Sequence, residues 1–195
     1  MYPKLIIDLN KLKENLDWLT FSCHRKGISV AIVTKVFCAD ERICSLIDAS
    51  RADLFADSRL QNLKVISTCK PKQLLRIPMQ SEIDDVVLMA DISMQSSPDT
   101  IRMSGESATR QNKRHKIILM IDLGDLREGI FFENMLKIYE TADAIVSCKG
   151  LEFYGVGVNL TCYGGILPDE KNLSKLIEIA ELLRKRYSLP IPVIS

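Results

Sequence analysis

The stretch Ile28-Ser29-Val30-Ala31-Ile32-Val33-Thr34-Lys35-Val36 decides the predicted fold. Most of it is apolar and β-branched, which is typical of a strand buried on both faces of a parallel sheet. One lysine, Lys35, stands near its C-terminal end. In barrels and in doubly wound α/β sheets, ligands bind at the C-terminal ends of the strands. The stretch therefore predicts a buried strand that carries an amine to a ligand-binding edge.

Lys35 can be interpreted in two ways. Among Val33, Val36 and Phe37 its amine would be partly desolvated, and desolvation favours the neutral form. A neutral amine can attack an aldehyde and form a Schiff base. Alternatively, the side chain snorkels from the strand end into solvent. This stretch alone leaves both interpretations open.

Strands and helices are predicted to alternate along the whole chain. A short strand over residues 5–7 comes first. Further strands are expected over residues 28–36, 52–56, 73–77, 91–94, 115–122, 151–158 and 191–195. A first helix is expected after a cap at Asp8 or Asn10, ending at Gly27. Later helices are expected over residues 39–49, 57–66, 82–89, 97–112, 132–144 and 172–187.

This alternation predicts a parallel sheet covered by helices, within a single domain over residues 1–195. A (β/α)8 barrel needs eight strands and typically about 250 residues. The predicted fold is therefore an incomplete (β/α)8 TIM-type barrel of about seven parallel strands. A doubly wound sheet is the structural alternative. The absence of a G-x-G-x-x-G pattern after the first strand weakens a dinucleotide-binding interpretation.

Composition limits the classes of partner. Of 195 residues, 47% are hydrophobic and 26% charged, with a formal net charge of +1. This balance indicates neither a nucleic-acid nor a membrane partner. No apolar run suggests a signal peptide or a membrane span, so we expect a cytoplasmic protein. Without a C-x-x-C pair, the cysteines are interpreted as reduced thiols rather than a disulfide frame or a zinc site: Cys23, Cys38, Cys44, Cys69, Cys148 and Cys162.

The loop after the strand at residues 115–122 places Arg127 between acidic residues and glycines. A guanidinium suits a carboxylate or a phenolate-like oxygen. The alternative is a surface turn with an internal Asp–Arg pair. Asp122 and Asp125 could also bind a divalent cation, but the spacing offers no third ligand.

Glycines surround Asn159 in the loop after the next strand. Glycine permits close approach of the backbone to a ligand, and Asn159 could hold a ring oxygen or a backbone group. The alternative is a tight turn that only requires positive φ angles. His24 and His115 fall on a helix and at a strand start, away from this edge. A Ser–His or Cys–His nucleophile is therefore not expected.

Taken together, these stretches resemble the alanine racemase group of pyridoxal-phosphate enzymes, known as fold-type III. Within it they are most similar to the ornithine/alanine racemase-like branch. The resemblance rests on residues 2–8 (YPKLIID), 33–36 (VTKV), 56–59 (ADSR), 75–79 (LRIPM), 121–129 (IDLGDLREG) and 157–165 (GVNLTCYGG).

The resemblance implies roles for three residues. Lys35 would hold pyridoxal 5'-phosphate as an internal aldimine and act as one of two bases that move the Cα proton. Arg127 would contact the phenolic oxygen of the cofactor and the carboxylate of a small amino-acid substrate. Asn159, a cofactor-binding candidate, falls where alanine racemases carry a histidine near the ring. Arg76 lies in a matching stretch without an assigned role.

In this group, a phosphate-gripping turn, an eighth strand and a C-terminal β-domain follow the seventh strand. The present sequence ends at Ser195, before those features. We therefore expect the N-terminal barrel portion of an amino-acid racemase, inactive on its own. We expect it to associate as a homo-oligomer or with a missing C-terminal part. The alternatives are a non-catalytic pyridoxal-phosphate-binding or homeostasis protein, and a cofactor-free fragment that acts through assembly.

Overall fold

The computed structural model describes residues 3–161 and 165–195, and the chain divides into two compact units. The first unit is Met1–Gln73 and the second is Leu74–Ser195. Residues 162–164 of the glycine-rich stretch at 157–165, Cys162 among them, lie outside the described residues. A single domain over residues 1–195 stays a prediction.

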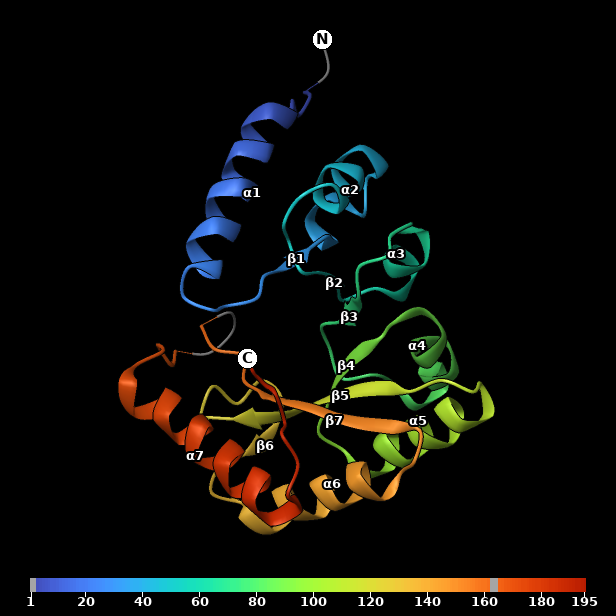
Figure 1. Ribbon diagram of the computed structural model, residues 1–195, viewed down its shortest axis with the longest axis vertical. Helices are drawn as coiled ribbons and strands as arrows, with labels where there is room; N and C mark the ends of the chain where they lie inside the picture. Colours follow the sequence, from blue (N-terminus) through green and yellow to red (C-terminus); the bar gives the residue numbers. More distant parts are fainter. Residues whose placement is uncertain (1–2, 162–164) are drawn as a thin grey trace. The chain divides into compact units, whose positions relative to one another are not determined.

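The first unit begins with a long helix and then alternates short strands with helices (Figure 1). Strand β1 pairs in parallel with β2, and Val33 lies opposite Ala56. The last strand, β3, spans the boundary between the units. The elements are α1 (Leu9–His24), β1 (Ala31–Val33), the 3-10 turn η1 (Lys35–Phe37), α2 (Glu41–Asp48), β2 (Leu54–Asp57), α3 (Leu60–Val65) and β3 (Lys72–Leu74).

The second unit contains a parallel sheet in the order β4-β5-β7-β8. The two-residue strand β6, which the sequence did not predict, pairs with the end of β5. The elements are η2 (Gln80–Glu82), α4 (Ile83–Met89), β4 (Ile92–Gln95), α5 (Pro98–Arg110), β5 (His115–Asp122), β6 (Ile130–Phe131), α6 (Met135–Ser147), β7 (Leu151–Gly157), α7 (Glu170–Tyr187) and β8 (Val193–Ile194).

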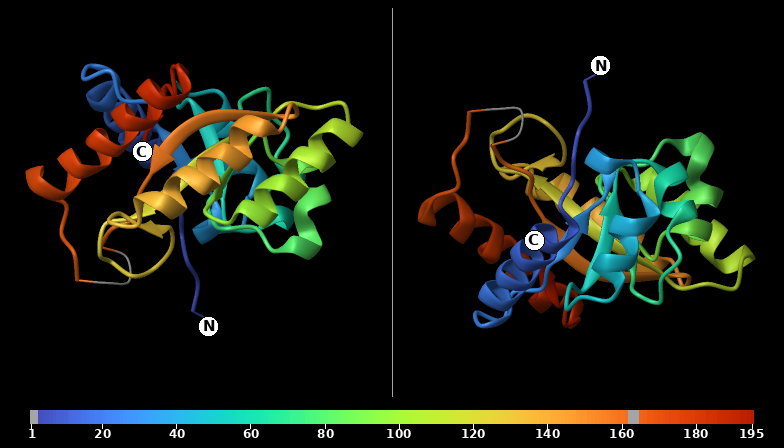
Figure 2. Two further views of the ribbon diagram at one scale, coloured as in Figure 1. Left: turned by 90° about the horizontal axis from the view of Figure 1, so that it is seen from below. Right: turned by 90° about the horizontal axis from the view of Figure 1, so that it is seen from above.

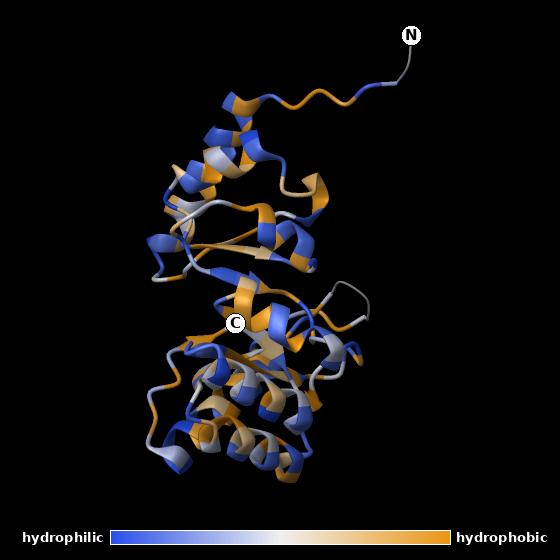
Figure 3. Ribbon diagram, turned by 90° about the vertical axis from the view of Figure 1, so that its right-hand side faces the viewer, coloured by the Kyte–Doolittle hydropathy of each residue, from blue (hydrophilic) through white to orange (hydrophobic). Residues whose placement is uncertain are grey.

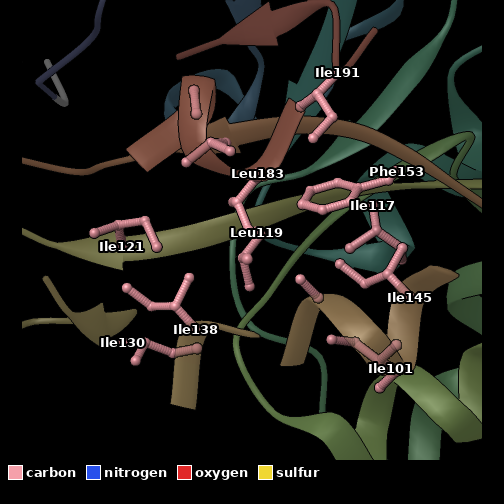
Figure 4. Packing of buried hydrophobic residues seen from close by; sticks show 14 of the residues in the cluster. Ile101, Ile117, Leu119, Ile121, Ile130, Ile138, Ile145, Phe153, Leu183 and Ile191 are labelled. Atoms are coloured by element: carbon pink, nitrogen blue, oxygen red, sulfur yellow. The ribbon is translucent and has the colours of Figure 1, made fainter. Parts of the chain in front are cut away.

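The core of the second unit lies between this sheet and its helices. Figure 2 shows α5 and α6 side by side along β7. Ile117, Leu119 and Ile121 of β5 point into the cluster, where they meet Ile138 of α6 and Leu183 of α7 (Figure 4). All of these side chains are fully buried. The apolar run of β5 therefore supplies the centre of this core.

Three helices begin directly after an aspartate that caps them. Asp8 accepts the backbone N–H groups of Asn10 and Lys11, as predicted for the cap of α1. Asp40 and Asp169 cap α2 and α7 in the same way. Such caps satisfy N–H groups that have no partner within the helix.

Residues 5–7 do not form the predicted first strand. They precede α1 as an irregular, mostly exposed segment, which Figure 3 colours as hydrophobic. A strand needs a neighbour for its backbone hydrogen bonds, and none pairs with this segment in the part of the chain that the structure describes. The apolar run was therefore a misleading sign of a strand.

The seven other predicted strands are all observed, although several are shorter than expected. The strand expected over 28–36 is Ala31–Val33, and the one expected over 73–77 is Lys72–Leu74. Among the described residues, no helix combines the length and the apolar character that a membrane span requires.

Candidate functional site

Lys35 follows β1 and is the first residue of the 3-10 turn Lys35–Phe37, so its predicted place inside the strand is wrong. The side chain is exposed, so the expected partial desolvation is not observed. Within residues 3–73 the Lys35 amine has no hydrogen bond or ion pair. The structure thus presents an accessible amine just beyond the C-terminal end of β1.

Thr34 ends the strand and begins the turn. Its backbone lies near φ −95° and ψ −6°, a sparsely populated region in which active-site residues are often found. The Thr34 carbonyl accepts the N–H groups of Phe37 and Ala39, each at 3.3 Å. These bonds fold the chain back immediately after β1, and Lys35 is carried on the resulting turn.

The turn closes through two consecutive non-glycine residues with positive φ. Cys38 has φ 50° and Ala39 has φ 55°, and the left-handed conformation costs about 1–2 kcal/mol for each. Backbone strain of this kind is concentrated at functional sites. A largely apolar cavity of about 590 Å³ lies beside the turn and is lined by Leu5, Ile6, Ile7, Leu9, Leu12, Val36, Phe37, Asp40, Arg42 and Ile43.

In the second unit, the loop after β5 carries Arg127. Oδ1 of Asp122 accepts the N–H groups of Gly124 at 2.9 Å and Leu126 at 3.1 Å, so this carboxylate organises the turn. Gly129 closes the loop with φ +109°. A Cβ there would lie 2.7 Å from the carbonyl carbon of Ile121, so only glycine fits.

Arg127 and Asn159 are brought together by Glu128, which we did not predict as a site residue. Oε1 of Glu128 lies 3.5 Å from Nε of Arg127 and accepts a hydrogen bond from Nδ2 of Asn159. The Arg127 side chain is 30% exposed and that of Glu128 is 13% exposed. Only its position next to Arg127 could have indicated Glu128, because the bond to Asn159 joins residues 31 positions apart.

Arg76 is held by Glu82. The guanidinium and the carboxylate form a bidentate pair in which Nη2 and Oε2 lie 2.8 Å apart. This hydrogen bonding raises the pKa of Arg76 and lowers the pKa of Glu82. Glu82 also accepts the N–H of Met79, so the pair fastens the chain at the start of α4.

The two histidines serve other purposes. Nε2 of His24, at the end of α1, lies 2.9 Å from Oδ2 of Asp53. His115 begins β5, is almost fully buried, and lies 2.8 Å from Oγ of Ser93. Burial lowers the pKa of His115 to about 4. Five cysteines are free in the described residues: Cys23, Cys38, Cys44, Cys69 and Cys148.

These features define a class of protein: an α/β chain of parallel strands, with an accessible amine after its first strand and an arginine loop after its fifth. The chain belongs to the alanine racemase family. The family model described as "Alanine racemase, N-terminal domain" matches residues 7–195. This match confirms the predicted family.

Two curated relatives align with the whole chain. One is an ornithine racemase of Acetoanaerobium sticklandii, 46% identical over 196 aligned residues. The match covers 100% of this chain and 55% of that racemase. The other is a lysine racemase of Thermotoga maritima, 34% identical over 198 aligned residues. The match covers 100% of this chain and 54% of that racemase. The chain therefore spans about half the length of these relatives.

Solved structures with low sequence identity share the fold. An alanine racemase of Clostridium difficile 630 superposes with a TM-score of 0.74 at 14% identity, covering 95% of this chain and 49% of that one. PipY of Synechococcus elongatus PCC7942 superposes with a TM-score of 0.75 at 14% identity, covering 93% of this chain and 86% of PipY. The predicted fold class, an incomplete (β/α)8 barrel, is confirmed. The alanine racemase family depends on pyridoxal phosphate.

Proposed function

We propose that this chain is the cofactor-holding part of a pyridoxal-phosphate-dependent amino-acid racemase that acts on a small basic amino acid, ornithine being the first candidate. The observation that carries the proposal is the 46% identity to an ornithine racemase along the whole chain. The second relative is named for lysine, and both amino acids carry a distal ammonium group. A basic side chain is therefore the shared feature of the proposed substrate class.

The residues present are suited to the cofactor. An aldehyde requires an accessible amine, and Lys35 offers one without a competing partner among residues 3–73. A phenolic oxygen requires a cation, and Arg127 offers a guanidinium that is 30% exposed. When bound, pyridoxal phosphate supplies an electron sink for the carbanion at Cα.

The proposed work of the protein is orientation and proton transfer. Lys35 would hold the cofactor through its aldehyde carbon and, once the substrate amine has displaced it, would take or return the Cα proton of the substrate. Arg127 orients the substrate carboxylate through paired N–H donors. Asn159 acts close to the ring. Glu128, which contacts both Arg127 and Asn159, maintains their spacing.

The proposal includes association with further chain. The two relatives are nearly twice as long as the aligned stretch. Exposed apolar side chains beside the Lys35 turn, among them Leu5, Ile6 and Val36, offer a surface for such an association.

Trapping the cofactor tests the central residue. The purified chain is mixed with pyridoxal phosphate, reduced with borohydride, digested and analysed by mass spectrometry. We expect the added mass on Lys35, and we expect Lys35→Ala to abolish the visible absorbance of the bound cofactor. Lys4→Ala, which removes another exposed lysine of the same unit, is the control. Equal labelling of all exposed lysines would contradict the proposal.

Racemisation is tested separately in a chimera. Residues 1–195 are joined to the part of the Acetoanaerobium ornithine racemase that lies outside the aligned stretch. We expect this chimera to racemise single enantiomers of ornithine faster than those of alanine, as followed by circular dichroism. A chimera that traps cofactor on Lys35 without racemising any amino acid would favour the non-catalytic cofactor-binding alternative.

A further inference from the structure

Asp57 is a buried carboxylate that the proposed function does not yet use. It ends β2 and is fully buried. No ion pair reaches it within the described residues. Three hydrogen-bond donors contact it instead. Oδ2 accepts hydrogen bonds from Oγ1 of Thr34 at 2.5 Å and from Nδ2 of Asn62 at 3.0 Å. Oδ1 accepts one from the backbone N–H of Arg59 at 2.8 Å. Burying a carboxylate without a cation is costly, and here three hydrogen bonds offset that cost and fix the carboxylate in place.

The first of these donors immediately precedes Lys35. The Thr34 side chain is fully buried, and its hydroxyl bonds Oδ2 of Asp57. The Thr34 N–H also donates to the carbonyl of Ala56 at 2.9 Å. Thr34 is thus tied to the end of β2 by both its backbone and its side chain. Its unusual backbone conformation directs the chain into the turn that carries Lys35.

We propose that Asp57, acting through Thr34, is a positioning residue that sets the direction in which Lys35 presents its amine. The proposal rests on the assignment of Lys35 as the cofactor-holding lysine. A reacting amine gains rate when the backbone that carries it is fixed before reaction, and displacements of about 1 Å can cost about 100-fold. The buried carboxylate provides such a fixed point.

The two oxygens of the Asp57 carboxylate have different partners. A positioning role toward Thr34 can therefore be tested separately from the role of Asp57 in holding α3. Among the described residues, Oδ1 accepts a hydrogen bond from the N–H of Arg59 alone, at the start of α3. Oδ2 bonds Thr34 and Asn62. Asp57→Asn preserves the size of the side chain but keeps one acceptor oxygen instead of two, so at least one of the three donors loses its acceptor. Thr34→Val removes the hydroxyl and leaves the contacts of Asp57 with α3 untouched.

The experiment measures the rate at which Lys35 reacts with an aldehyde. The lysine nitrogen adds to the carbonyl carbon, the carbonyl oxygen leaves as water, and a C=N bond forms; cyanoborohydride then delivers hydride to the carbon. Two probes are used, pyridoxal phosphate and formaldehyde. The product on Lys35 is quantified by mass spectrometry relative to the product on exposed Lys4 in the same sample.

We expect Thr34→Val and Asp57→Asn each to reduce trapping of pyridoxal phosphate at Lys35 at least 10-fold. We also expect each to change the Lys35/Lys4 ratio for formaldehyde at least 2-fold. Thr20→Val is the matched control, because Thr20 is equally buried in the same unit and its hydroxyl donates to the α1 carbonyls of Leu16 and Asp17. It should leave both readouts within 2-fold of the wild-type chain.

The outcomes separate this inference from the proposed function. If the wild-type chain traps pyridoxal phosphate on Lys35 and both variants do so at the wild-type rate, the inference is overturned and the proposed function stands. If the wild-type chain does not trap it, the proposed function fails, and the formaldehyde ratio alone decides the inference. Circular dichroism checks folding, and if Asp57→Asn does not fold, Thr34→Val decides.

Discussion

The two compact units differ in how completely they bury their apolar side chains. In Leu74–Ser195, one cluster joins β5 and β7 to the helices α4, α5, α6 and α7. In Met1–Gln73, the 16-residue helix α1 buries only Leu16 and Thr20, while its Trp18 is 69% exposed. The candidate lysine lies in the unit whose first helix is largely exposed, and the candidate arginine lies in the unit that contains the large cluster.

This contrast shows that stability and the proposed lysine chemistry are placed in different parts of the chain. Segments that bind ligands are usually drawn from the less stable parts of a structure. In the first unit, directional contacts such as the one between Thr34 and Asp57 add to the apolar core near the candidate lysine, which includes the fully buried Phe55 and Ala56. Four predictions test how far the contrast holds.

The largest expected effect is loss of packing in the second unit. Leu119 is fully buried at the centre of β5, so Leu119→Ala should lower the free energy of unfolding by about 4 kcal/mol. Leu19 of α1 is 43% exposed, and Leu19→Ala should cost about 1 kcal/mol or less. Urea denaturation followed by circular dichroism measures both. Equal losses would remove the contrast between the units.

The strand that carries Leu119 also shows what could be predicted from sequence. Residues 115–122 were predicted as β5 with the observed bounds, because a continuous apolar run buried on both faces needs no further information. The run before Lys35 looked similar, yet its strand ends at Val33. Thr34 bonds Asp57, 23 residues away, and this tertiary contact is invisible in a local pattern.

The candidate site was predictable to the same extent. Arg127 and Asn159 were identified from motifs, and the structure brings them together. Glu128 was missed because its bond to Asn159 depends on the approach of two loops. The segment at residues 5–7 was wrongly predicted as a strand, since strand formation depends on a pairing neighbour and apolar character alone does not provide one.

The second prediction concerns the dependence of stability on pH. Burial lowers the pKa of His115 from 6.5 to about 4, and Lys113 acts in the same direction, against the Ala90 backbone and Asp91. Between these values the unfolded chain binds more protons than the folded one, so stability falls as pH falls from about 6.5 towards 4. The loss should reach about 3 kcal/mol.

Denaturation midpoints measured at a series of pH values test this dependence. His115→Asn removes the titrating ring, so the slope attributable to this group should disappear. A variant that keeps the full wild-type slope would show that another group of the chain controls acid sensitivity.

The third prediction concerns the loop that carries Arg127. Gly129→Ala should cost about 2 kcal/mol, because the new methyl group would lie 2.7 Å from the backbone of Ile121 at a φ of +109°. Gly27 is the matched control in the first unit: it also has a positive φ, but nothing lies within 4 Å of its Cβ position. Gly27→Ala should therefore cost only about 1 kcal/mol, from backbone strain alone. Thermal unfolding distinguishes the two, and similar shifts would refute the steric argument.

The smallest loss of stability is expected at the helix caps. There the two units should differ in how far along the helix amide exchange increases, and the size of the stability loss should be similar. Asp8→Ala and Asp169→Ala each remove a cap contact worth about 1 kcal/mol. Helix α7 buries four apolar side chains along its length, so loss of its cap should increase amide exchange only in its first turn. Helix α1 buries far less, and its hydrogen bonds depend more on the cap, so exchange should increase along the whole helix. Hydrogen–deuterium exchange with peptide resolution measures this distribution, and faster exchange confined to the first turn of α1 would mean that this helix is better supported than its burial indicates.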